Sequence, residues 1–98
     1  MRKVNIAESV WVQINDLADY LVEDLKISES SAHDRCARMI DFIASLSAEV
    51  DYPLCRFRRW RKLGYRCAVF ERDWVLAYEV FKEGVVVRDM SHVKLLKG

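Results

Sequence analysis

The sequence predicts a single α+β domain in which a helical hairpin packs on a small, mainly antiparallel sheet. Two observations predict this class. In the first half, apolar residues recur with helical spacing in two separate stretches. In the last third, β-branched and aromatic residues are frequent and follow a period of two. The predicted order of elements is therefore β-α-α-β-β-β.

The first half begins with a short strand and an amphipathic helix. Residues 3–6 alternate between polar and apolar side chains, as expected for an edge strand that joins the sheet from the other end of the chain. Ser9 is the expected N-cap of a helix. Apolar residues then recur with helical spacing as far as Leu25, and acidic residues fill several of the other positions. A helix from Ser9 to Leu25 with one apolar face is therefore predicted.

A second amphipathic helix is predicted to begin near Ser30 or Ser31, where Ser31 and Asp34 form a capping-box pattern. It ends before Tyr52-Pro53, because the residue ahead of a proline avoids helical backbone angles. The link between the two helices is short, so they are expected to form an antiparallel hairpin. The apolar stripe of this hairpin needs a partner, and the predicted sheet provides one.

Three antiparallel strands are predicted in the last third, at residues 65–70, 74–81 and 85–91. The polar segments between them are short enough for hairpin turns, and Gly84 can adopt the positive φ that such turns require. The last two strands are apolar on both faces. One face is therefore expected to lie under the helices, and the other under some further cover or a partner protein.

The composition fits one cytoplasmic domain. Its 98 residues are 52% hydrophobic, which is enough to bury one core without cross-links. No apolar run is long enough to cross a bilayer, and the N-terminus lacks the apolar region of a signal peptide, so we expect no membrane contact. The three cysteines lack CxxC spacing and the two histidines lie far apart in the sequence. We therefore expect reduced thiols, no metal and no cofactor.

Charge is distributed unevenly along the chain. Residues 1–50 carry five Lys/Arg and nine Asp/Glu, whereas residues 51–98 carry eleven and six, and the whole chain has a net charge of +1. The densest basic cluster includes two aromatic residues and consists of Arg56, Phe57, Arg58, Arg59, Trp60, Arg61 and Lys62. This segment has two interpretations. In the first, its cations contact phosphates or an acidic partner while its aromatics stack on a base or fill a groove. In the second, it is a solvated loop whose aromatics fold into the core.

Arg66, His92 and Lys94 are further candidate site residues. Arg66 could stabilise a developing phosphorane charge, bind a carboxylate of a partner protein, or simply pair with a neighbouring acid such as Glu79. A histidine has the pKa that general acid–base chemistry on a 2′-hydroxyl requires. A single histidine at a strand end is more often a structural residue, so His92 has both interpretations. Lys94 lies close to it in sequence and adds a positive charge.

Two aromatic residues are candidate contacts for a partner protein. Trp11 falls off the apolar stripe of the first helix, so we expect it to be exposed, where it would suit the binding of another protein or of a second copy of this chain. Tyr78 lies in the middle of a strand and fits either core packing or partner contact. The same apolar surface can serve either self-association or the binding of a partner protein. A homodimer is therefore an open alternative.

The order and spacing of one set of residues, which spans nearly the whole chain, form a pattern. These residues are Asp16-Leu17, Tyr20-Leu21, Ala37, Ile40, Ile43, Leu46, Pro53, Arg66, Trp74, Tyr78, Val80, residues 85–87, His92 and Lys94. In this order and spacing the chain resembles the RelE/ParE superfamily of bacterial toxins from type II toxin–antitoxin modules. Lys94 stands where ParE-like chains favour Arg. Val75 and Leu76 stand where the RelE-like ribonuclease branch commonly has an Arg, so the resemblance favours the ParE-like branch.

The resemblance implies a toxin that binds DNA gyrase, inhibits replication and growth, and performs no covalent chemistry of its own. It also implies neutralisation by a cognate antitoxin whose C-terminal segment wraps the helices and the sheet. On this interpretation the basic cluster from Arg56 to Lys62, together with Lys94, faces the target. Trp11 and Tyr78 are then the expected antitoxin contacts.

Two alternatives come with this interpretation. In a ribosome-dependent mRNA endoribonuclease, His92 would act as acid or base while Arg58, Arg61 and Arg66 brace the scissile phosphate. Such nucleases are usually strongly basic, and a chain with a pI of about 7.7 is attracted only weakly to ribosomal RNA. The second alternative is a non-toxic interaction domain of the same fold. Toxicity to the host on induction would distinguish the gyrase-binding toxin and the endoribonuclease from this non-toxic domain.

Overall fold

The computed structural model describes residues 1–96 and shows an α+β fold. Within these residues the elements are β1 (Lys3–Ile6), α1 (Glu8–Glu23), α2 (Glu29–Ala44), α3 (Arg58–Arg61), β2 (Arg66–Phe70), β3 (Trp74–Val80) and β4 (Gly84–His92). Two short 3-10 turns, η1 (Ser45–Ser47) and η2 (Val93–Leu95), follow α2 and β4. The predicted α+β class is confirmed, and α3 is an addition that the sequence pattern did not predict.

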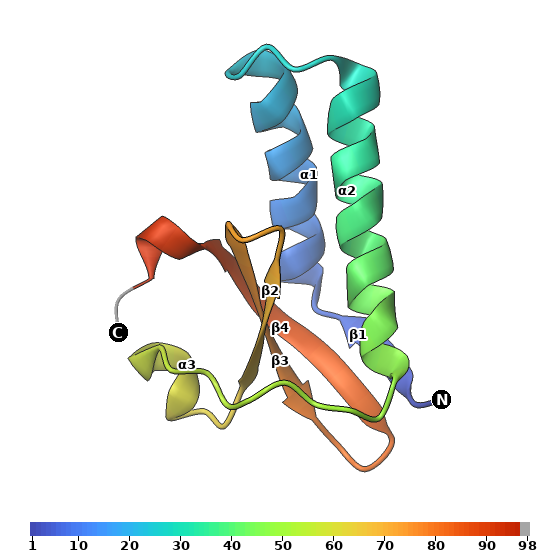
Figure 1. The fold of residues 1–98 in the computed structure, drawn as a ribbon, viewed down its shortest axis with the longest axis vertical. Coiled ribbons are helices and arrows are strands. Elements are labelled where there is room, and N and C mark those ends of the chain that lie inside the picture. The colour runs from blue at the N-terminus through green and yellow to red at the C-terminus, as the bar shows by residue number, and fades with distance from the viewer. Residues whose placement is uncertain (97–98) are drawn as a thin grey trace.

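The sheet is mixed, with the strand order β1-β4-β3-β2 (Figure 1). β2, β3 and β4 are antiparallel neighbours, and β1 pairs with β4 in parallel. The N-terminal strand therefore joins the sheet from the other end of the chain, as the alternation in residues 3–6 predicted. In Figure 1 the hairpin of α1 and α2 rises past the upper end of the sheet.

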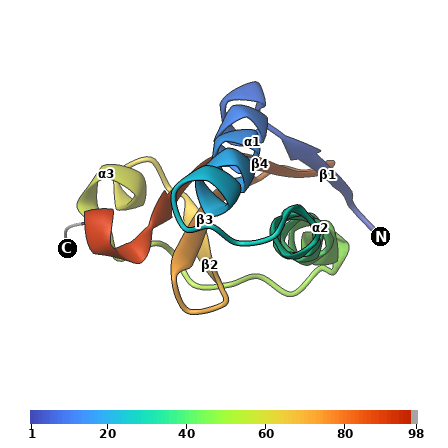
Figure 2. The ribbon, with the colours of Figure 1, turned by 90° about the horizontal axis from the view of Figure 1, so that it is seen from above.

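β3 lies between two hydrophobic cores, because successive side chains of a strand point to opposite faces of the sheet. Trp74, Leu76 and Tyr78 pack in the larger core, which the helical hairpin covers. The smaller core lies on the other face and consists of buried Cys55, Phe57, Trp60, Val75 and Ala77. The segment around α3 is therefore the second cover that strands apolar on both faces require. Figure 2 shows α3 and α2 on opposite sides of the strands.

Both long helices begin earlier than predicted. α1 starts at Glu8 with Ala7 in the N-cap position, so Ser9 is not its cap. α2 starts at Glu29 and is capped by Ser28, whose Oγ accepts a hydrogen bond from the backbone N–H of Ser31 at 3.1 Å. The predicted capping box at Ser31 is wrong, because the upstream serine already satisfies this exposed backbone donor.

Gly84 does not supply the left-handed turn backbone that we predicted. Among the described glycines, positive φ occurs at Gly64. The absence of a side chain at Gly84 instead allows β1 to approach β4, since a Cβ at this position would lie 2.2 Å from the carbonyl oxygen of Lys3. The left-handed residues of the β2–β3 turn are Glu71 and Arg72, with φ values of 48° and 70°.

Cys55 and Cys67 form a disulfide with their Cα atoms 4.8 Å apart, while Cys36 is a buried free thiol. The expectation of reduced thiols is therefore wrong for this pair. An antiparallel bridge between Leu54 and Arg66 brings the two cysteines side by side, and this tertiary contact leaves no CxxC signature in the sequence. Burial raises the pKa of the Cys36 thiol above its ordinary value.

Candidate functional site

The basic segment folds around two aromatic side chains that point inward. Phe57 and Trp60 are 8% and 2% exposed, and their rings meet edge to face with 6.1 Å between centroids. A spacing of three residues places both on one side of a helical turn, which is α3. The predicted role of Trp60 as a stacking contact is wrong, because its ring is part of the smaller core. The alternative that the aromatics fold into the core is confirmed.

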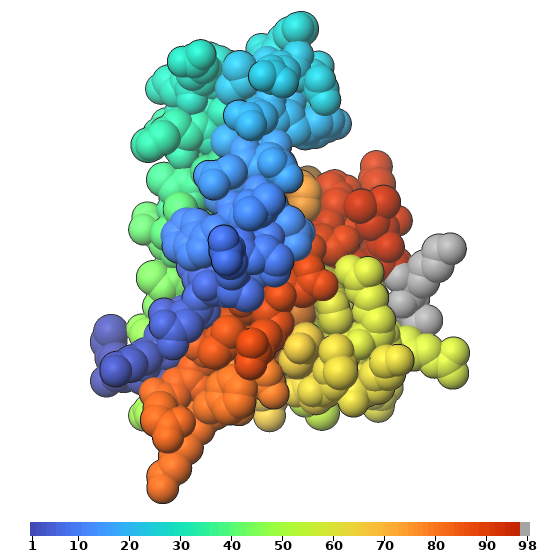
Figure 3. Space-filling model, turned by 180° about the vertical axis from the view of Figure 1, so that it is seen from behind, coloured from blue at the N-terminus to red at the C-terminus, as the bar shows by residue number. Residues whose placement is uncertain are grey.

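The basic side chains of this segment point the other way. The exposed cations of the segment are Arg56, Arg58, Arg59, Arg61 and Lys62, and Lys94 in η2 is exposed as well. Within residues 1–96 none of them forms an ion pair with a carboxylate. The guanidinium groups of Arg56 and Arg59 lie over the rings of Phe57 and Trp60, 5.3 and 4.7 Å from the centroids, so buried aromatics help to position surface cations. Figure 3 shows this segment in yellow beside β4 and apart from the hairpin.

Asp89 on β4 anchors α3 to the rest of the fold. Its Oδ2 accepts the indole N–H of Trp60 at 3.3 Å. Its Oδ1 accepts the side-chain amide of Gln13 on α1 at 3.2 Å and the backbone N–H of Met90 at 2.8 Å. One half-buried carboxylate therefore joins α1, α3 and β4, and it fixes where α3 presents its cations. The sequence offered no signal for this role, because a single aspartate within a strand carries no motif.

A groove of about 630 Å³ lies between the chain that leads into α3 and the edge strand β2. Its lining includes the exposed side chains of Leu54 and Val69, each 54% exposed, and two arginines, Arg56 and Arg72. Arg72 was not among the predicted site residues and comes from the left-handed β2–β3 turn. A lining of this kind suits a partner segment that combines apolar side chains with carboxylates.

Arg66 has a different neighbour from the one we predicted. Its Nη1 donates a hydrogen bond to the backbone carbonyl of Tyr52 at 2.7 Å and so holds the linker between α2 and α3. The suggested pairing with Glu79 is wrong, because Glu79 binds Arg88 at 3.0 Å on the neighbouring strand. Arg66 is half-buried and donates a hydrogen bond to the backbone, whereas the cations of α3 are exposed and form no ion pair within residues 1–96.

Tyr78 lies in the larger core with 0% exposure, so its predicted role as an antitoxin contact is wrong and the core interpretation is confirmed. Its hydroxyl accepts the backbone N–H of Tyr52 at 2.9 Å and donates to Asp51 Oδ1 at 3.4 Å. Burial raises the pKa of this hydroxyl above its ordinary value. The hydrogen bond from Arg2 lowers the pKa of the Asp51 carboxyl, and this ion pair ties the N-terminus to the same linker.

His92 caps the turn that follows β4. Its Nδ1 accepts the backbone N–H of Lys94 at 3.1 Å, and its ring packs edge-on against Trp74 with 5.3 Å between centroids. In the sheet register His92 faces Trp74, whereas Arg66 faces Tyr78, four residues further along β3. At the rise of a strand this is a separation of about 13 Å along the sheet. The structure therefore does not bring His92 and Arg66 together.

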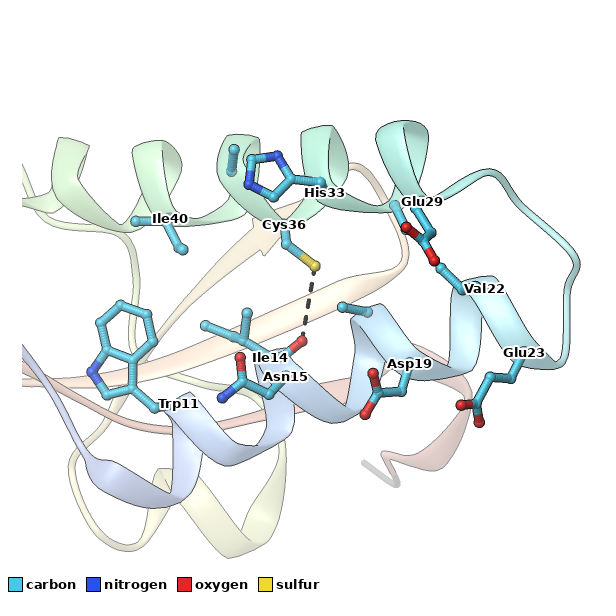
Figure 4. Close-up of a pocket in the computed structure, with 13 residues that line it drawn as sticks. Trp11, Ile14, Asn15, Asp19, Val22, Glu23, Glu29, His33, Cys36 and Ile40 are labelled. Carbon is cyan, nitrogen blue, oxygen red and sulfur yellow. Dashed lines mark hydrogen bonds between the residues drawn. The ribbon is translucent and has the colours of Figure 1, made fainter.

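A second groove, of about 450 Å³, runs between α1 and α2. Trp11 lies at one end and is 40% exposed, which confirms the predicted exposure. At the other end the carboxylates of Asp19 and Glu23 on α1 and Glu29 on α2 line the groove (Figure 4). In the described part of the chain these three carboxylates form no ion pair. This groove combines an apolar floor with an acidic end, a feature that the sequence pattern did not reveal.

No protein-family model matches this sequence, and no match was found among curated proteins or solved structures. Between residues 1 and 96, no helix has the length and apolar character needed to cross a membrane. Over the same residues, no three His, Cys, Asp or Glu side chains gather in a way that could hold a metal ion. Among residues 1–96 the structure offers as candidate sites the two grooves and a cation surface, which is formed by Arg56, Arg58, Arg59, Arg61, Lys62 and Lys94.

Proposed function

We propose that this chain is a ParE-like toxin of a type II toxin–antitoxin pair, and that it inhibits DNA gyrase by binding through the cations of α3. The observation that carries the proposal is the set of exposed cations from Arg56 to Lys62, which form no ion pair within residues 1–96 and lie on a turn anchored by buried Phe57 and Trp60. Cations held in fixed positions select an acidic protein surface by charge complementarity. The resemblance of the chain to the RelE/ParE superfamily supplies the class of target.

Binding without covalent chemistry is favoured by the distribution of the polar residues. A ribonuclease needs an acid or base and a phosphate-binding arginine around one scissile bond. Here His92 and Arg66 lie at different ends of the sheet register, and each already has a structural hydrogen bond. The hydroxyl of Tyr78 is buried and hydrogen-bonded, so it is not free to replace either of them.

The groove between α1 and α2 is the proposed docking site for the antitoxin. Trp11 is a large, partly exposed aromatic residue of the kind that anchors protein interfaces. The carboxylates of Asp19, Glu23 and Glu29 favour an antitoxin segment that flanks apolar residues with Lys or Arg. The lining of the groove contains no Lys or Arg, so a second copy packed groove to groove would leave these carboxylates without a cation. Charge therefore favours a different protein over a second copy.

The test is to induce the chain in a bacterial host and to follow DNA and protein synthesis by pulse labelling within minutes. DNA synthesis is expected to stop first, and the purified chain is expected to inhibit supercoiling by purified DNA gyrase. The variant Arg58→Gln/Arg59→Gln/Arg61→Gln should lose about tenfold or more of this inhibition, because it removes three interfacial charges while the aromatic anchors stay in place.

The matched control is Lys3→Gln/Lys26→Gln/Lys82→Gln, which removes the same net charge from exposed positions outside α3. This control should inhibit gyrase as well as the unmodified chain does. If translation stops before DNA synthesis, the ribonuclease alternative replaces the proposal. If neither process changes, the chain is better described as an interaction domain of the same fold.

A further inference from the structure

The disulfide between Cys55 and Cys67 encloses almost the whole cation surface. We call the enclosed residues, 56–66, the basic loop; they contain six Lys/Arg and no Asp/Glu. One cross-link therefore closes a ring around the densest positive charge of the chain. The same loop carries the residues that are proposed above to contact the target.

Apart from the disulfide, the basic loop is held to the fold chiefly by the packing of Phe57 and Trp60 and by the hydrogen bond from Trp60 to Asp89. α3 has only four residues, and helices this short are not stable by themselves. The like charges of the loop repel one another. Opposing this, Phe57 and Trp60 pack in a core of five buried residues, of which Cys55 is itself one. The disulfide thus contributes both a covalent constraint and part of the packing that holds α3 against the sheet.

One of the two sulfur-bearing residues is open to a reductant. Cys55 is 1% exposed, whereas Cys67 is half-buried and lines the groove beside β2. A thiolate can therefore approach the sulfur of Cys67 from the groove, with Cys55 as the leaving group on the buried side. Arg56 and Arg72 line the same groove and favour the approach of an anionic thiolate.

We propose that Cys55 and Cys67 form a thiol–disulfide switch that controls the order of the basic loop and, resting on the proposed function, the binding of its target. The reductant is a dithiol. Its first thiolate forms a bond to the Cys67 sulfur, which breaks the Cys55–Cys67 bond and releases Cys55 as a thiolate. Its second thiolate then displaces Cys67. The protein gains two electrons and two protons, and the dithiol becomes a disulfide.

The expected size of the effect follows from loop closure. Opening a covalent ring of this length raises the equilibrium constant for detachment of the loop from the sheet by up to about 100-fold. Amide hydrogen exchange from Trp60 to Lys62 should therefore accelerate by as much as that factor on reduction. Target affinity should fall by a factor between about 3 and 100, because only the fraction of molecules with an ordered α3 is competent to bind.

The experiment uses the full chain, equilibrated in glutathione buffers from oxidising to reducing and then denatured and alkylated. Mass spectrometry should show one alkylated thiol, that of Cys36, on the oxidising side and three on the reducing side. Hydrogen exchange and binding to purified DNA gyrase are then measured on both forms. Exchange of residues 17–21 in α1 is the internal control and should not change. The variant Cys55→Ser/Cys67→Ser should match the reduced form and no longer respond to reductant.

The outcomes separate this proposal from the proposed function. Three alkylated thiols in every buffer, or equal exchange of the basic loop in both forms, would overturn the switch. Faster exchange of the loop with weaker gyrase binding supports the switch and its control of the target. Faster exchange of the loop without gyrase binding in either form supports the switch and removes gyrase as the target.

Discussion

The indole N–H of Trp60 donates a hydrogen bond to Asp89 Oδ2 at 3.3 Å and so joins α3 to β4. Trp60 is separated from Asp89 by the whole β2–β3 hairpin in sequence, yet the contact decides which way the basic segment faces. With the ring of Trp60 held inward, the neighbouring residues Arg59 and Arg61 are left at the surface. A buried residue of the cluster thus orients the exposed ones.

Replacement of Trp60 by Phe should destabilise the protein by about 1–2 kcal/mol, because it removes a hydrogen bond to a carboxylate and part of a buried ring. The free energy of unfolding from urea titration measures this change. Trp11→Phe is the matched control. Since Trp11 is partly exposed, its replacement should change stability by less than about 0.5 kcal/mol. Equal effects of the two variants would contradict the anchoring role of Trp60.

Replacement of Gly84 by Ala should detach β1 from the sheet. The added Cβ would stand 2.2 Å from the Lys3 carbonyl oxygen, and a backbone atom has little freedom to move away. We expect a loss of about 2 kcal/mol or more, with faster amide exchange in β1. Gly64→Ala has open space around the new Cβ but a φ of 76°, so it should cost about 1–2 kcal/mol and leave exchange in β1 unchanged.

Replacement of Tyr78 by Phe keeps the ring in the larger core and removes the hydroxyl that accepts the N–H of Tyr52. The backbone donor then loses its partner, so stability should fall by about 1 kcal/mol, and the linker after α2 should exchange its amides faster. Tyr20→Phe is the control, because Tyr20 is 48% exposed on α1. No difference between the two variants in a urea titration would argue against the polar network.

The ion pair of Arg2 and Asp51 should make stability dependent on pH in the acid range. The hydrogen bond from Arg2 lowers the pKa of Asp51 in the folded state below its ordinary value of 3.8. The contribution of the pair is therefore complete above pH 3.8 and is lost as pH falls through the lower folded value.

We expect Asp51→Asn to cost about 0.5–1 kcal/mol at pH 7, and the difference from the unmodified chain to shrink below about pH 4. Urea titrations at pH 7, 5 and 3 measure this difference in the free energy of unfolding. Glu71→Gln is the control, since it breaks an exposed ion pair with Arg38 and should cost less. A constant difference across this pH range would contradict the assignment.

The sequence by itself determined the fold class, the helical hairpin and the approximate positions of the strands. Local periodicity carries that information, because a period near 3.6 or of two decides which side chains can be buried together. It also located the basic cluster and the exposure of Trp11. Helix starts were less well predicted, because several serines could cap α2 and only one, Ser28, does so.

Only the tertiary structure decided which residues of the basic cluster face inward, which cysteines pair, and which residues anchor α3. Trp60, Cys67 and Asp89 come from three different elements and meet at the smaller core and its edge. The register of the sheet fixes how far His92 lies from Arg66, because it places them opposite Trp74 and Tyr78 on the two sides of β3. The physical reason is that these roles depend on contacts between residues distant in sequence, which local patterns do not encode.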